Sequence, residues 1–208
     1  QVRNQLTPYF DSQEQANAAL SRAASIARET HQPLADVGEL YARLTSQSER
    51  LGLSQLQIAR STELIGKAAS LSGGAPESQQ QAVRQLIQGL GSGNLGGDEL
   101  RSVKEGAFQL AQAIASGFKN ADGSIGTTID KLKELGAAGE LSTQKVVDAI
   151  NRSGLAIDAQ FGKRQITAKQ GLVDIQNAAI ITVGRLDQAV GFTNKLGEGL
   201  AFVATNLD

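Results

Sequence analysis

Five glycines lie within nine positions of the stretch QGLGSGNLGGDEL, residues 88–100, at positions 89, 91, 93, 96 and 97. Gly91, Gly93 and Gly96 satisfy G-x-G-x-x-G, the spacing at which a tight turn presents backbone N–H groups to the pyrophosphate of a dinucleotide. That fingerprint also requires a strand before the first glycine and an acidic residue about twenty positions later. Here the preceding VRQLIQGL has helical spacing, and residues 111–117 are again predicted to be helical. We therefore predict no dinucleotide site.

The same glycines also fail as a phosphate-binding loop. Gly91 and Gly96 have the separation found in G-x-x-x-x-G-K-[ST], but Gly97 and Asp98 stand where the lysine and the hydroxyl residue should follow. An aspartate at this position would repel phosphate. The glycines therefore predict a hinge and a cap between two packed helices, with no cofactor-binding residue among them.

Other residue types that could carry chemistry are few. His31 is the single histidine, and one imidazole at a predicted helix junction is more often a cap or a surface residue than a base or a ligand. Asp98 and Glu99 are neighbours in sequence, so their side chains point apart on a helix and form an ordinary acidic first turn. One histidine rules out H-E-x-x-H, no G-x-S-x-G occurs, and the absence of cysteine removes thiolate metal sites. We predict no catalytic or metal-ligating residue and no enzyme.

The charge balance bears on possible partners. Twenty basic and twenty-one acidic side chains give a formal net charge of -1, which provides no long-range attraction for a polyanion. We therefore expect no specific nucleic-acid partner. No apolar run approaches the roughly eighteen residues of a membrane helix. The sequence starts at Gln1 and contains no methionine, and we expect it to be an interior part of a longer chain.

Helix start and stop signals recur along the first three quarters of the sequence. Ser54 followed by Gln57 forms a capping box, in which the hydroxyl accepts from the third amide and the glutamine reaches back. Asp98 is predicted to cap a helix that starts at Glu99 and keeps its apolar spacing through Ile114. Further signals are at Asp11, Ser12, Thr30, Pro33, Gly52, Gly73, Gly74, Pro76 and Ser142.

These signals predict an all-α fold. A compact bundle of short helices is expected at 1–152, followed at 153–208 by a helical arm of one or two longer helices. Aromatic residues make up only 4% of the chain, so the alanine and glycine stripes predict close packing of helices rather than membrane insertion. The arm has a wide apolar pattern from Leu172 to Leu207, and we expect it to pack against a copy of itself or a partner protein.

The order of several short motifs resembles a known family. Leu51–Ser54 is a Leu-Gly-Leu-Ser helix start, residues 72–75 form a Ser-Gly-Gly-Ala break, residues 85–90 begin with Gln-Leu, and Leu95 precedes Gly-Asp-Glu-Leu-Arg-Ser at 97–102. Together, over residues 51–118, they resemble the N-terminal conserved region of tailed-phage tape measure proteins. The similarity continues through GELSTQKVVDAI at 139–150 and weakly into the last quarter of the chain. The family often has a proline soon after the position of Glu105, where this chain has Gly-Ala-Phe.

The resemblance implies a structural protein of the virion tail that lies inside the tube. In that family the protein sets tube length during assembly and leaves with or ahead of the DNA. It implies contacts with copies of itself, with tail tube and tail tip proteins and with tail assembly chaperones, synthesis in the host cytoplasm, and contact with the host envelope during ejection. The alternative reading is a membrane-active helical translocator or pore component.

Overall fold

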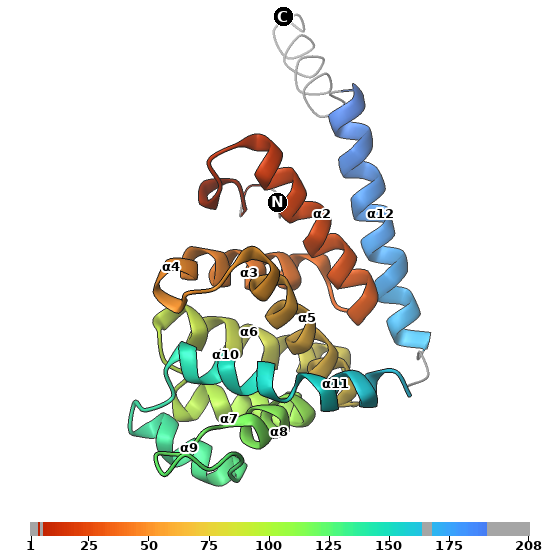
Figure 1. Ribbon diagram of the computed structural model, residues 1–208. Coiled ribbons are helices and arrows are strands. Elements are labelled where there is room, and N and C mark those ends of the chain that lie inside the picture. Colours follow the sequence, from red (N-terminus) through yellow and green to blue (C-terminus); the bar gives the residue numbers. More distant parts are fainter. Residues whose placement is uncertain (1–3, 5, 164–167, 191–208) are drawn as a thin grey trace, which may run out of the picture.

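The computed structural model describes residue 4 and residues 6–163 and 168–190. Within these ranges the chain forms one short 3-10 helix and eleven α-helices, with isolated bridges instead of strands, so the predicted all-α fold is confirmed (Figure 1). The elements are η1 (Thr7–Tyr9), α2 (Gln13–Thr30), α3 (Leu34–Ser46), α4 (Ser48–Leu51), α5 (Gln55–Leu71), α6 (Pro76–Ser92), α7 (Gly97–Gly106), α8 (Phe108–Gly117), α9 (Ile129–Ala137), α10 (Thr143–Arg152), α11 (Gly154–Phe161) and α12 (Ala168–Val190).

Helix α5 lies at the centre of the bundle. It packs against α2, α3, α8, α10 and α11 and also touches α6, while α6 and α7 form a pair that extends to α9. The side chains that α5 buries include several small ones, among them Ala59, Ala68 and Ala69. Small side chains let helix backbones approach one another closely, which explains how one helix can contact six others.

Two glycines mark the closest helix crossings. A Cβ atom added to Gly117 in α8 would lie 1.9 Å from the carbonyl oxygen of Ala149 in α10. A Cβ atom added to Gly106 in α7 would lie 2.3 Å from the carbonyl oxygen of Ser78 in α6. Both distances are far below a normal contact, so these crossings require glycine. The predicted role of the small residues in close helix packing is confirmed at these positions.

Most of the predicted helix ends are found where the local signals placed them. The Ser12 hydroxyl accepts from the Gln15 amide at 3.2 Å, and both halves of the capping box between Ser54 and Gln57 are present. The Ser142 hydroxyl accepts from the Lys145 amide at the start of α10. These caps satisfy amides that the helices themselves leave without partners.

The helix predicted from Glu99 to Ile114 is wrong in two respects. Asp98 does not cap it, because α7 begins at Gly97 with Gly96 in the N-cap position. The predicted single helix is also divided into two helices, α7 and α8, because Ala107 leaves helical geometry at φ −143° and ψ 64°. The cause is tertiary: α6 crosses α7 at Gly106, and the Ser72 hydroxyl accepts from the Gln109 amide that the break sets free, at 3.0 Å.

The last two described helices occupy the region predicted as an arm. Helix α11 begins at Gly154 and packs on α5, whereas α12 lies along α2, and its blue end projects beyond the bundle (Figure 1). The division into 1–152 and 153–208 stays a prediction. The part of the apolar pattern at 191–208, including Leu196, Leu200 and Leu207, lies outside the described residues.

Candidate functional site

The three glycines of G-x-G-x-x-G lie at a helix connection. Gly91 is in the last turn of α6, Gly93 ends that helix in the left-handed conformation at φ 95°, and Gly96 precedes α7. The loop between the helices is joined to the segment before α10. The Leu95 amide donates to the Leu141 carbonyl at 2.8 Å, and the Thr143 amide donates to the Gly93 carbonyl at 3.0 Å. The helix connection predicted from these glycines is therefore confirmed.

Side chains from α3 and α4 cover the end of α6. The Arg43 side chain lies 3.6 Å from where a Cβ atom of Gly91 would be, and an Arg50 guanidinium nitrogen lies 3.2 Å from that of Gly93. Between α3 and α4, the side-chain Nε2 atom of Gln47 donates to the Leu90 carbonyl at 2.7 Å. Cations and donors suit the partial negative charge at a helix C-terminus. The arrangement caps a helix end, which is the opposite polarity from a phosphate-binding N-terminus.

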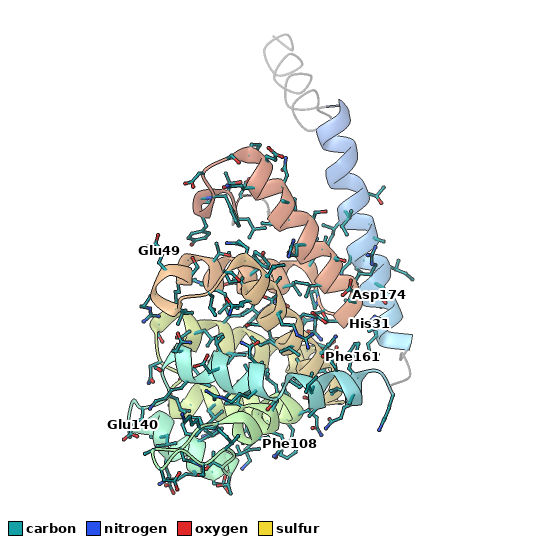
Figure 2. All side chains as sticks on the ribbon, viewed as in Figure 1. His31, Glu49, Phe108, Glu140, Phe161 and Asp174 are labelled. Atoms are coloured by element: carbon teal, nitrogen blue, oxygen red, sulfur yellow. The ribbon has the colours of Figure 1, made fainter. Side chains whose placement is uncertain are left out.

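His31 takes the C-cap position of α2, which is one of the two outcomes, a cap or a surface residue, that the sequence predicts. It has a positive φ of 54°, the only such value among the non-glycine residues that the structure describes. Its Nδ1 atom lies 2.7 Å from Oδ2 of Asp174 in α12, and its ring stacks on Phe161 of α11 with centroids 6.4 Å apart. Figure 2 shows these three side chains together at the junction of α2, α11 and α12. One imidazole thus joins α2 to α11 and α12, two consecutive helices that come much later in the sequence.

Asn177, which is only 3% exposed, makes the second contact between α12 and the bundle. Its Oδ1 atom accepts from the Leu34 amide at 2.9 Å, and its Nδ2 atom donates to the Gln32 carbonyl at 2.8 Å. The N-cap position of α3 is Pro33, which makes no side-chain cap. Helix α12 therefore supplies the cap that the local sequence of α3 lacks. We call His31, Gln32, Asp174 and Asn177 the polar node.

The node continues into the centre of the bundle. The Gln32 side chain donates from Nε2 to the Ser70 hydroxyl of α5 at 2.9 Å, and the Ser70 hydroxyl in turn donates to the Thr30 carbonyl. Gln32, Ser70 and Thr30 are all buried. Such satisfied polar contacts fix one arrangement of the elements that they join. The sequence analysis did not identify Asp174 and Asn177. The signal that could have indicated them is a pair of polar residues at positions i and i+3 within an apolar stretch.

In its described part, helix α12 turns Asp174 and Asn177 towards the bundle and exposes several of its apolar side chains. Along the docked side, Asp174, Asn177 and Ile181 recur at helical spacing, and Asn177 is the buried one. On the opposite side lie Leu172, 55% exposed, and Ile175, 68% exposed. This is the reverse of an ordinary surface helix. The exposed side is therefore the strongest candidate for a contact surface on α12.

A charged cluster fixes α11 to α5. The Asp158 carboxylate of α11 pairs with Arg60 and with Lys67, whose Nζ atom lies 2.7 Å from Oδ1, and both cations also pair with Glu63. The hydrogen bond from Arg60 lowers the pKa of Asp158, although burial acts in the opposite direction. Burial pulls down the pKa of Lys67, but its hydrogen bonds to Asp158 and Glu63 raise that pKa overall. All four charges are compensated within the cluster, which indicates a structural role.

A surface pocket of about 350 Å³ lies between α7 and α9. Its apolar wall includes Phe108, which is 46% exposed. Four of its five charged side chains are paired with one another, Lys104 with Asp130 at 2.9 Å and Arg101 with Glu105 at 3.2 Å. The pocket thus holds no group arranged as a nucleophile beside a base.

The remaining residues considered in the sequence as candidates for chemistry lie in ordinary structural positions. Asp98 and Glu99 lie in the first turn of α7, where the helix dipole favours carboxylates. In the described part of the chain, no group of three histidine, cysteine or acidic side chains is placed to hold a metal ion. No described helix is both long enough and apolar enough to cross a membrane. The absence of catalytic, cofactor and metal residues stays a prediction.

Comparison with known proteins identifies the family. The family model described as "Tape measure protein" matches residues 1–188. No curated protein and no solved structure matches the chain. The family match covers nearly all of the chain, including every described helix except the last two residues of α12. The chain therefore belongs to the tape measure protein family, whose members are structural components of phage tails.

Proposed function

We propose that this chain is a folded module of a tape measure protein and is not the stretch whose extension sets tail length. In this proposal it lies inside the tail tube, acts without catalysis, and leaves the tail during genome ejection. Length would be set by another, extended part of the same polypeptide. The supporting observation is how compactly the described residues fold.

The argument rests on helix length. A continuous helix rises about 1.5 Å per residue, so the 208 residues would span roughly 310 Å as a straight rod. The longest described helix, α12, has 23 residues, which corresponds to about 35 Å. The other helices fold back on one another around α5. A stretch folded in this way contributes little length for the number of residues that it contains.

The exposed side of α12 supports a role in assembly. Leu172, Ile175 and Ile180 are all more than half exposed on one helix. Exposed apolar stretches of this kind mark contact surfaces. We propose that they pack against a second copy of the chain or against a tail tube or tail tip protein, and that the tube provides neighbours related by rotational symmetry. Tail assembly chaperones would cover the same surface before assembly.

Insertions test the proposal, with tail length measured by electron microscopy. The turn at Asp122–Ser124 is exposed, so 36 extra helix-forming residues can be inserted there without entering the core. If the module does not measure, tail length stays unchanged. If this stretch is part of the ruler, the tail lengthens by up to about 54 Å for 36 residues.

The matched control places the same 36 residues in the extended part of the tape measure polypeptide. The proposal expects the full increase there and none at Asp122–Ser124. Equal lengthening at both positions would contradict it. A separate deletion of the module that shortens the tail in proportion to the residues removed would also contradict it.

A further inference from the structure

The described side chains of helix α12, at 170–182, contribute little to the apolar core. The fully buried apolar cluster is formed by residues between Leu6 and Ile157, and among the α12 side chains that the structure describes, at 170–182, only Ile181 packs against it, partly buried. The described contacts of α12 with the bundle are mainly those with α2 and the polar node. The bundle therefore has its core without α12.

We propose that α12 is a releasable arm, which the polar node holds in one register on a bundle that keeps its fold when the arm leaves. This inference concerns the chain alone and does not depend on the proposed role in tail length. It follows from which groups change their surroundings when α12 leaves the bundle.

Among the side chains of α12 that the structure describes, release changes the exposure of few apolar ones. Leu172 and Ile175 already face solvent in the docked state, so the hydrophobic effect does little to oppose release. The groups set free are polar: the Leu34 amide, the Gln32 carbonyl, and the side chains of Asp174 and Asn177. Water can replace the hydrogen bonds of all of them, and an intramolecular hydrogen bond exchanged for one to water has a small net value.

The same contacts explain why docking is specific. Asp174 meets His31 while Asn177, one turn later, meets both Gln32 and Leu34. A shift of α12 by one turn would remove both sets of partners at once. Directional polar contacts are the type that select one register among several of similar packing. The node thus gives α12 a defined docked position without the large apolar area that would make docking permanent.

The test uses the fact that the chain contains no cysteine, so one introduced thiol is unique. Ile181→Cys places a thiol on the docked side of α12, and Thr182→Cys places one at the exposed neighbouring position. The rates of reaction with an aromatic disulfide reagent are measured for both in the folded 208-residue chain, and their ratio reports how often α12 is undocked. Amide hydrogen exchange in α8 and α10 is measured in parallel and reports on the bundle.

Adding Asn177→Ala is expected to raise the ratio of the rates at least about tenfold, while exchange in α8 and α10 stays unchanged. The control Ile175→Gln alters only the exposed side of α12 and should leave the ratio as it is. An unchanged ratio with Asn177→Ala would overturn the proposal. So would a rise in exchange of α8 and α10 by the same factor, or loss of the helical circular dichroism signal, because either would mean that the bundle needs α12.

Discussion

Replacing Gly117 by alanine tests whether α8 and α10 cross as closely as the structure places them. The added Cβ atom would lie 1.9 Å from the Ala149 carbonyl oxygen, and an ordinary contact begins at 3.4 Å. The obstacle is backbone within a helix, so it cannot rotate away as a side chain can. The two helices must therefore separate locally by about 1.5 Å, the difference between these two distances.

That separation breaks contacts that the crossing now makes. The Ser153 hydroxyl donates to the Ala113 carbonyl at 2.7 Å, and Arg152 donates to the Gly117 carbonyl at 3.0 Å. An increase of 1.5 Å takes the buried Ser153 bond beyond hydrogen-bond range. Overpacking typically costs about 1–3 kcal/mol, and a buried polar group left without its partner costs about 1–3 kcal/mol more. We expect Gly117→Ala to lower the free energy of unfolding by about 3 kcal/mol.

Equilibrium urea unfolding, followed by far-UV circular dichroism, measures this loss. For a chain of this size the thermal midpoint should fall by about 6–12 °C. The control is Gly91→Ala, because a Cβ atom there would meet the Arg43 side chain at 3.6 Å, an ordinary contact. This control should be neutral or stabilise by up to about 1 kcal/mol, since alanine favours a helix. Stabilities of the two variants within about 0.5 kcal/mol of each other would refute the close crossing, since the structure predicts a larger difference.

Three further outcomes are expected. The Arg60 hydrogen bond lowers the pKa of Asp158, so the stability from this pair is present above the ordinary value of 3.8 and is lost as pH falls through the lowered value. The free energy of unfolding of the unaltered chain and that of the Asp158→Asn variant should therefore differ at pH 7 and converge in acid. A difference that stays constant with pH would contradict this. Isothermal titration with ATP or NAD should give no saturable heat. Saturable binding that the Gly91→Ala substitution abolishes would instead support a nucleotide-binding site at the glycines. In co-sedimentation with anionic liposomes the chain should stay in the supernatant, and pelleting would favour the membrane-active alternative.

The sequence predicted those helix ends whose signals are local. Ser54 and Gln57 are three residues apart and complete their capping box within one helical turn, so no distant contact decides the outcome. The Gly91 and Gly93 connection was predictable for the same reason, because the helical spacing before it excludes a strand. All-α architecture follows from the same local periodicity.

The errors and omissions come from contacts between distant residues. The break at Ala107 depends on α6 crossing at Gly106, and the glycine alone is a weak signal, because a single glycine is often tolerated inside a helix. The polar node depends on Asn177 meeting Leu34, 143 residues away. His31 could be predicted as a cap from its place between two helices, but its contact with Asp174 could not be predicted. Such contacts exist only once the bundle has assembled.

The distance of 143 residues between Leu34 and Asn177 also sets an order of events during synthesis. A ribosome adds about 5–20 residues per second, so the start of α3 emerges roughly 7–30 s before its cap does. Throughout that interval water must solvate the Leu34 amide while helices α5 to α10 are being made. The nascent chain therefore passes through a state in which the residues of the bundle have been made and α12 has not.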